Sequence, residues 1–206
     1  LGTTSTVDYT SAGGQSITSG NYANISNSGN GSRTLENGGT IAISGAFSPG
    51  SGNYTTTNST VVYNGTSAQT AVALAPSSKY NNLTINNAAG VSMNANLNLE
   101  GALTLTNGVF TTTGYTFTFL STQTQTARIA PVTSGSISGN VTIQRFVPGG
   151  DAGWTFIGMP ATGRTIADWT DDITTSGFTG STTGTGTFVS IYGYDETVGG
   201  NADASA

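Results

Sequence analysis

The stretch VSMNANLNLEGALTLTNGVFTTTGYTF (residues 91–117) contains five residue pairs that begin six positions apart. One residue separates the members of each pair, and this spacing points both side chains toward the same face of a β-strand. All members except Thr111 are apolar, and turn-permissive Gly or Asn residues lie between the pairs. The pairs are Val91/Met93, Leu97/Leu99, Leu103/Leu105, Val109/Thr111 and Tyr115/Phe117.

This alternation of short strands and bends predicts an all-β fold, a parallel β-helix or β-solenoid. Three six-residue steps would close a coil of about 18 residues. On that count we expect Ile85 to stack on Leu103, and Val91 on Val109, in an apolar column with Thr, Ser and Asn facing outward. An antiparallel meander is the alternative, because the Asn-Gly dipeptide at residues 107–108 also favours a hairpin.

A longer repeat is present in the first part of the chain. STVDY (residues 5–9) with Gln15 matches STVVY (59–63) with Gln69, YANISN (22–27) matches YNNLTIN (80–86), and GAF (45–47) matches GAL (101–103). The offset is 54, then 58, then 56 residues, so one repeat has about 56 residues with small insertions. We therefore expect a solenoid over residues 1–143, with repeat 1 at about 5–58 and repeat 2 at about 59–114.

The chain changes character near residue 144. Residues 144–206 contain seven of the ten acidic residues and both tryptophans. VPGG (147–150) indicates a turn, and the β-formers in residues 154–158 and 187–192 predict strands. We expect the start of a β-sandwich-like element here, incomplete and followed by a flexible C-terminal tail.

Composition excludes several classes of function. The net charge is −5 and the five basic residues are scattered, so a nucleic acid is not an expected partner. No apolar run approaches the roughly 20 residues that a membrane-spanning helix needs. The chain has no His and no Cys, which removes Ser–His–Asp and Cys–His catalysis. Residues 1–143 hold only three acids, far apart in sequence, so we expect no enzymatic activity.

Two candidate sites lie in the acidic region. Asp168, Asp171 and Asp172 could supply oxygen ligands to calcium, although a D-x-x-D-D spacing matches no calcium loop and also suits a solvated turn. Trp169 could stack on a sugar ring of a surface glycan, although burial is the commoner fate of aromatic side chains. Apart from the possible calcium, no cofactor is expected.

The segments YNNLTINN (residues 80–87) and GALTLTNG (101–108) resemble repeats in large secreted proteins of Bacteroidetes-type bacteria. VTIQRFVP (141–148), GWTFIGMP (153–160) and TIADW (165–169) resemble the segment that follows those repeats. The resemblance implies an adhesin-like protein exported by the type IX secretion system, with that system's outer-membrane translocon and shuttle components as partners. It implies an extracellular or cell-surface location and, in some members, a link to gliding motility. It brings no catalytic residues.

Together these observations predict a non-catalytic structural or adhesin segment at the cell surface. One alternative is a carbohydrate-binding adhesin module with the Trp-bearing region as its tip. Another is the accessory region of a secreted enzyme whose catalytic domain lies outside this sequence.

Overall fold

The computed structural model describes residues 4–77, 79–147, 165, 174–186 and 188–192. Twenty β-strands and no helix occur among these residues. The chain divides into two compact parts, Leu1–Gly153 and Trp154–Ala206, and every described strand lies in the first part.

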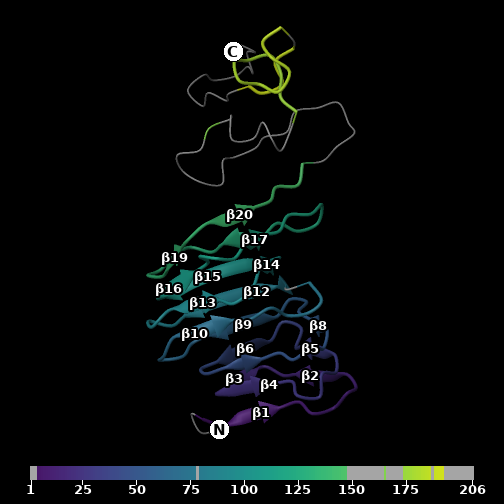
Figure 1. Cartoon of the computed structure of the whole chain (residues 1–206), viewed down its shortest axis with the longest axis vertical. Coiled ribbons are helices and arrows are strands. Elements are labelled where there is room, and N and C mark those ends of the chain that lie inside the picture. The colour runs from purple at the N-terminus through teal and green to yellow at the C-terminus, as the bar shows by residue number, and fades with distance from the viewer. Residues whose placement is uncertain (1–3, 78, 148–164, 166–173, 187, 193–206) are drawn as a thin grey trace. The chain divides into compact units, whose positions relative to one another are not determined.

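The first part is a parallel β-solenoid (Figure 1). Three strands make one coil, so the described strands form six full coils and a seventh that holds two strands. Each strand pairs in parallel with a strand one coil away, as β12 (Asn82–Asn86) does with β9 (Thr60–Tyr63) on one side and β15 (Ala102–Asn107) on the other. The predicted solenoid is therefore confirmed, and the antiparallel meander is excluded.

The twenty strands form five sheets. One three-stranded sheet contains β1 (Thr6–Asp8), β4 (Asn24–Ser26) and β7 (Phe47–Ser48). The other contains β2 (Gln15–Ile17), β5 (Arg33–Leu35) and β8 (Tyr54–Thr55). The six-stranded sheet contains β3 (Gly20–Tyr22), β6 (Thr40–Ile43), β9 (Thr60–Tyr63), β12 (Asn82–Asn86), β15 (Ala102–Asn107) and β18 (Arg128–Ile129). One four-stranded sheet contains β10 (Gln69–Ala71), β13 (Val91–Met93), β16 (Val109–Thr111) and β19 (Ser136–Ser138). The other contains β11 (Lys79–Tyr80), β14 (Leu97–Leu99), β17 (Phe117–Phe119) and β20 (Val141–Ile143).

The predicted stacking of individual residues is wrong in two places. Ile85 pairs with Leu105 rather than Leu103, and Val91 pairs with Phe110 rather than Val109. The expected coil of 18 residues occurs at the first step, where Thr6 pairs with Asn24, but the step from Leu83 to Leu103 takes 20. The coils are longer because their corners hold more residues than a six-residue count allows.

A β-bulge explains why Val109 faces outward. Ile85 pairs with Leu105 but Asn86 pairs with Asn107, so Thr106 is one extra residue in β15. One extra residue reverses which side chains face inward. Phe110 is fully buried in consequence, while Val109 is 41% exposed.

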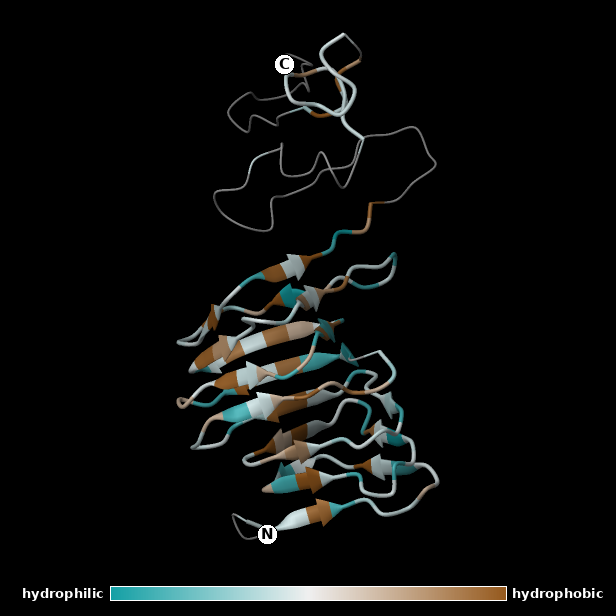
Figure 2. Cartoon of the chain, in the orientation of Figure 1, coloured by the Kyte–Doolittle hydropathy of each residue, from teal (hydrophilic) through white to brown (hydrophobic). Residues whose placement is uncertain are grey.

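Strands throughout the stack carry hydrophobic residues (Figure 2), and the buried ones form one apolar column that runs through the coils. The predicted members Leu97 and Leu103 are fully buried in it. Aromatic rings fill the upper coils, where Phe117 packs edge-to-face on both Phe110 and Phe119 with ring centroids 5.1 Å apart. Burial of such side chains contributes about 1.5–3 kcal/mol each, so this column is the main source of the solenoid's stability.

The 56-residue repeat corresponds to eight strands. STVDY and STVVY become β1 and β9, and YANISN and YNNLTIN become the β3–β4 and β11–β12 corners. Because eight is not a multiple of three, equivalent strands lie in different sheets: β4 belongs to a three-stranded sheet and β12 to the six-stranded sheet. Successive repeats therefore present the same sequence on different faces of the solenoid.

The part Trp154–Ala206 has no strand among its described residues. Thr175 is buried there, and its hydroxyl lies 3.2 Å from that of Thr182. Residues 188–192 do not form the strand predicted for 187–192. The predicted strand at 154–158 lies outside the described residues, and the β-sandwich-like element stays a prediction.

Candidate functional site

The sequence-predicted site residues lie outside the described residues. They are Trp169, Asp168, Asp171 and Asp172. The sugar platform and the calcium site therefore stay predictions. Within the described stretches, no group of three or more His, Cys, Asp or Glu residues could hold a metal ion.

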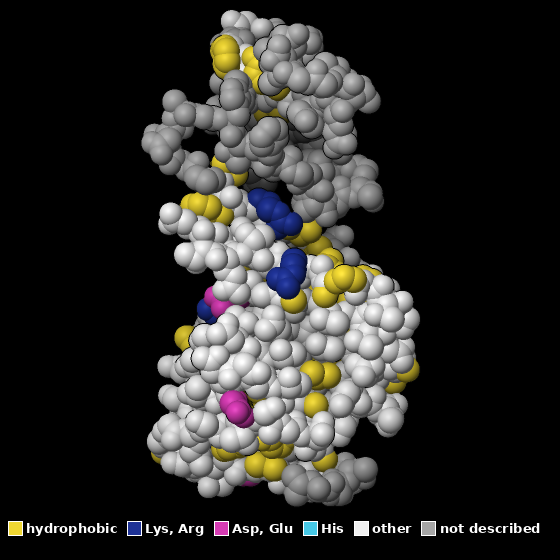
Figure 3. Space-filling model, turned by 180° about the vertical axis from the view of Figure 1, so that it is seen from behind, with side chains coloured by type: hydrophobic (Ala, Val, Ile, Leu, Met, Phe, Trp, Pro, Cys, Tyr) yellow, Lys and Arg dark blue, Asp and Glu magenta, His cyan; other side chains and the backbone are white. Residues whose placement is uncertain are grey.

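The outer surface of the solenoid is polar and largely uncharged. On the face shown in Figure 3, most of the described surface is uncharged polar side chains and backbone, with only a few basic and acidic side chains. Outward strand positions include polar residues, as with the paired Thr84 and Thr104 on β12 and β15. Such a surface stays wettable without strong electrostatic attraction to charged ligands.

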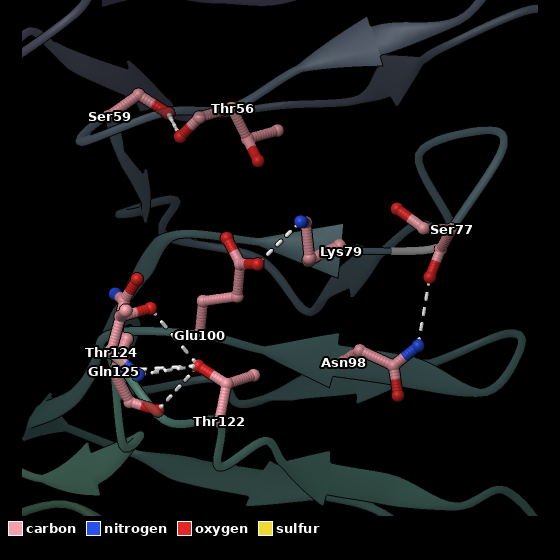
Figure 4. A network of polar contacts seen from close by, with 9 residues as sticks. All are labelled: Thr56, Ser59, Ser77, Lys79, Asn98, Glu100, Thr122, Thr124 and Gln125. Carbon is pink, nitrogen blue, oxygen red and sulfur yellow. Dashed lines mark hydrogen bonds and ion pairs between the residues drawn. The ribbon is translucent and has the colours of Figure 1, made fainter.

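Among the described residues, one ion pair interrupts this neutral surface. Lys79 on β11 donates to Glu100, which follows β14, with Nζ and Oε1 2.5 Å apart (Figure 4). The two side chains are 33% and 27% exposed. Glu100 also borders a hollow of about 320 Å³, here called the loop hollow, lined by Glu100, Leu120, Thr122, Thr124 and Gln125. Its one carboxylate is already paired with Lys79, and its other polar groups are hydroxyls and an amide.

A second depression, here called the corner hollow, has a volume of about 360 Å³. It lies where the chain turns from one four-stranded sheet into the other, across three consecutive coils. The turn has three residues between β13 and β14, five between β16 and β17, and two between β19 and β20. The longest turn thus lies between two shorter ones. The lining residues are Asn96, residues 112–116, Gly139 and Asn140.

Hydrogen bonds fix the shape of the corner hollow. The buried Thr112 donates its hydroxyl to the carbonyl of Asn140 at 2.8 Å, and Asn96 Oδ1 accepts from the amide of Thr116 at 2.8 Å. Gly139 has φ of 114°, and a Cβ there would lie 2.5 Å from the Thr112 hydroxyl, so only glycine fits. Tyr115 is 43% exposed at the tip of the turn.

The interior of the solenoid contains a buried arginine, Arg33. Arg33 is fully buried on β5 and donates to the carbonyl oxygens of Tyr9, Ser11, Gly13 and Ser32 at 2.9–3.0 Å. Its guanidinium also lies 5.7 Å from the centre of the Tyr9 ring. These bonds tie the loop before β2 to the coil above it, which is a structural role.

Two buried tyrosines form another interior polar group. The hydroxyls of Tyr63 and Tyr80 lie 3.0 Å apart, and Tyr80 donates to the carbonyl of Val72 at 2.6 Å. Burial raises the pKa of Tyr63 to about 12 and raises that of Tyr80 well above its ordinary value. Both phenols therefore stay neutral at physiological pH and act as hydrogen-bonding groups of the core.

Sequence reasoning missed these groups for different reasons. In the repeat alignment Arg33 takes the place of Val91, an inward position, and that match was the signal for its burial. Tyr80 is the first residue of the matched segment YNNLTIN, so the sequence shows that this tyrosine is repeated. It does not show that the Tyr80 hydroxyl would lie against that of Tyr63. The corner hollow depends on unequal turn lengths in three coils, which no single motif encodes.

The fold and its surface define the class: this is a β-solenoid protein. Comparisons with protein-family models, with curated proteins and with solved structures found no match to the chain. In the part of the chain that the structure describes, no helix has the length and hydropathy needed to cross a membrane.

Proposed function

We propose that this chain is a non-catalytic structural segment of an adhesin-type protein, exported by the type IX secretion system and displayed at the cell surface. The observation that carries the proposal is the stacking of coils around one apolar column, with the six-stranded sheet continuous from β3 to β18. Each added coil extends the solenoid by about 4.8 Å, the spacing between paired strands. The segment would therefore act as a stiff spacer that holds other parts of the protein away from the membrane.

The neutral outer surface supports the same role. Seven charged residues occur among the described residues, and one of them, Arg33, is buried. A surface of Thr, Ser and Asn stays hydrated at any ionic strength because it does not depend on charge. The export route rests on the likeness of residues 80–87, 101–108 and 141–169 to Bacteroidetes-type secreted proteins.

A domain exchange tests the spacer role. In the full-length protein, residues 5–143 are replaced by an unrelated β-solenoid with the same number of coils. Surface display and the adhesion or gliding phenotype should be retained, because a spacer contributes length and stiffness rather than a specific surface. A Gly/Ser linker of equal residue number is the control, and it should impair the phenotype because a flexible chain sets no fixed distance. Loss of the phenotype with the unrelated solenoid would overturn the proposal.

Export needs its own measurement. Antibodies against this chain should label intact cells of the producing bacterium, and labelling should disappear in a strain without the type IX translocon. Labelling that requires cell lysis in the wild-type strain would contradict the surface location. Labelling that persists without the translocon would contradict the route but not the location.

A further inference from the structure

We propose that the corner hollow binds one ring of a neutral sugar. This goes beyond the spacer role and concerns residues of the solenoid, not the acidic region that contains Trp169. The hollow's volume of about 360 Å³ lies in the range of small-ligand sites, roughly 300–1,000 Å³.

The chemistry of the lining indicates an uncharged, hydroxyl-rich ligand. No lining residue carries a charge, and apart from glycines the lining consists of asparagine, threonine and tyrosine. Amides and hydroxyls both donate and accept, as the hydroxyls of a sugar do. An anionic ligand would find no cation here, and an apolar ligand would leave these polar groups without partners.

Several polar groups of the hollow remain available to a ligand. Among the described residues, the side-chain amide of Asn140 and the hydroxyl of Tyr115 have no hydrogen-bond partner within the chain. Thr112 and the Oδ1 atom of Asn96, in contrast, are occupied in holding the turn. Thr112 and Asn96 therefore fix the shape of the hollow, whereas the polar groups of Asn140 and Tyr115 can bond to a ligand.

Tyr115 supplies the aromatic surface that sugar recognition commonly uses. A half-exposed phenol offers an apolar ring face to the C–H groups of a pyranose, together with a polar hydroxyl. Repeat 1 has no such ring at its equivalent turn. At that turn the buried Ser59 stands where repeat 2 is followed by Tyr115. The rest of the turn is alike: Thr56 corresponds to Thr112, and Asn58, with φ of 53°, corresponds to Gly114, with φ of 89°. The turn can thus form without an exposed aromatic, so its backbone does not require Tyr115.

Saturation-transfer NMR on the whole 206-residue chain tests the proposal. The probes are the methyl glycosides of glucose, galactose, mannose and N-acetylglucosamine at millimolar concentration, with glucuronate as the charged comparison. At least one neutral glycoside should receive saturation, and glucuronate should receive less. Absence of transfer to every neutral probe, or equal transfer to glucuronate, would overturn the assignment.

Three variants locate the binding. Tyr115→Ala and Asn140→Ala should each weaken binding about five- to tenfold, as expected for loss of one aromatic contact or one paired polar group. Phe146→Ala removes an exposed aromatic that does not line the hollow and should bind as the wild type does. Circular dichroism confirms that each variant is folded. Equal binding by Tyr115→Ala and the wild type would place the sugar elsewhere and refute the proposal, while the spacer role would be unaffected.

Discussion

Repeat 1 (β1–β8) and repeat 2 (β9–β16) follow equivalent chain paths, yet they fasten the loop before their second strand with different side chains. In repeat 1 the carbonyls of Ser11 and Gly13 accept from the buried Arg33. In repeat 2 the carbonyl of Ser67, which corresponds to Gly13, accepts from the amide of Asn87 at 2.8 Å. The shared backbone path places the same loop carbonyl, that of Gly13 or Ser67, where it needs a hydrogen-bond donor. The side chain that donates to it differs between the repeats.

Other features are the same in both repeats. Gln15 and Gln69 each accept the amide of the residue four positions before them, Ser11 and Gly65. The hydroxyl of Tyr22 donates to the carbonyl of Thr18, as that of Tyr80 does to Val72. These shared contacts close the corners of a coil, and this explains why their residues recur in the sequence.

The corner glycines show the same constraint. A Cβ on Gly45 would lie 2.7 Å from the carbonyl oxygen of Ala23, and a Cβ on Gly101 would lie 2.7 Å from that of Asn81. Both glycines also donate their amides to those carbonyls at 2.7 Å. Two chain segments approach so closely at this corner that only glycine fits.

Replacing the arginine gives the largest expected effect. Arg33→Met keeps most of the side-chain volume but leaves the carbonyls of Ser11 and Gly13 without their donor, while that of Tyr9 keeps the amide of Gly29. We expect the free energy of unfolding to fall by about 2–4 kcal/mol, since a buried polar group without a partner costs about 1–3 kcal/mol and removal of a buried charge offsets part of this. Urea unfolding measures the change, and hydrogen exchange should rise first in residues 9–15.

The control for this variant is Arg128→Met, at an exposed position on β18. It should change stability by less than about 0.5 kcal/mol. If the two variants were equally stable, the guanidinium of Arg33 would not be what fastens the loop.

Alkaline pH should destabilise the solenoid, because burial raises the pKa of tyrosines in its core. Tyr63 has a pKa of about 12 in the folded protein, whereas an unfolded tyrosine ionises near its ordinary value of 10. The native state therefore keeps a proton that the unfolded state loses. Stability should be unaffected below pH 10 and should fall by about 2–3 kcal/mol between pH 10 and 12.

Unfolding midpoints in urea at pH 9 and pH 11.5 measure this loss. In Tyr63→Phe the loss should be smaller, because the phenol that must ionise is absent. Burial also raises the pKa of the equivalent Tyr9 in the first coil, so Tyr9→Phe should reduce the loss as well. If neither variant reduced the loss, ionisation of buried tyrosines would not be its cause.

Much of the fold could be predicted because it depends on local patterns. Apolar–x–apolar pairs separated by Gly or Asn predicted three short strands per coil. The sequence segments shared by the two repeats, YANISN and YNNLTIN, mark equivalent corners. The register could not be predicted from a six-residue count, because the bulge at Thr106 reverses the faces and places Phe110, not Val109, in the core. The buried Arg33 was also missed, since a lone basic residue in a polar sequence resembles a surface residue until its inward match, Val91, is considered.

Removing the amide that fastens repeat 2 should have a smaller effect than removing Arg33. Asn87→Ala deletes bonds to the carbonyl of Ser67, to Gln69 Oε1 and to the amide of Ala89. We expect a loss of about 1–3 kcal/mol, with faster hydrogen exchange in residues 64–68. Asn98→Ala is the matched control, because its amide bonds to Ser77 at an exposed site. Protection of residues 64–68 that is unchanged in Asn87→Ala would contradict this role.

The smallest effect belongs to the ion pair between Lys79 and Glu100. Repeat 1 has the neutral Asn21 and Ser44 at the same positions, so the coil does not require charges there. Half-exposed pairs contribute about 0.2–1 kcal/mol, and salt screens them. A double-mutant cycle with Lys79→Gln and Glu100→Gln should give a coupling energy in that range at low salt and close to zero in molar salt. A coupling energy that salt leaves unchanged would mean that the contact acts as a desolvated hydrogen bond, and repeat 2 would then depend on it in a way that repeat 1 does not.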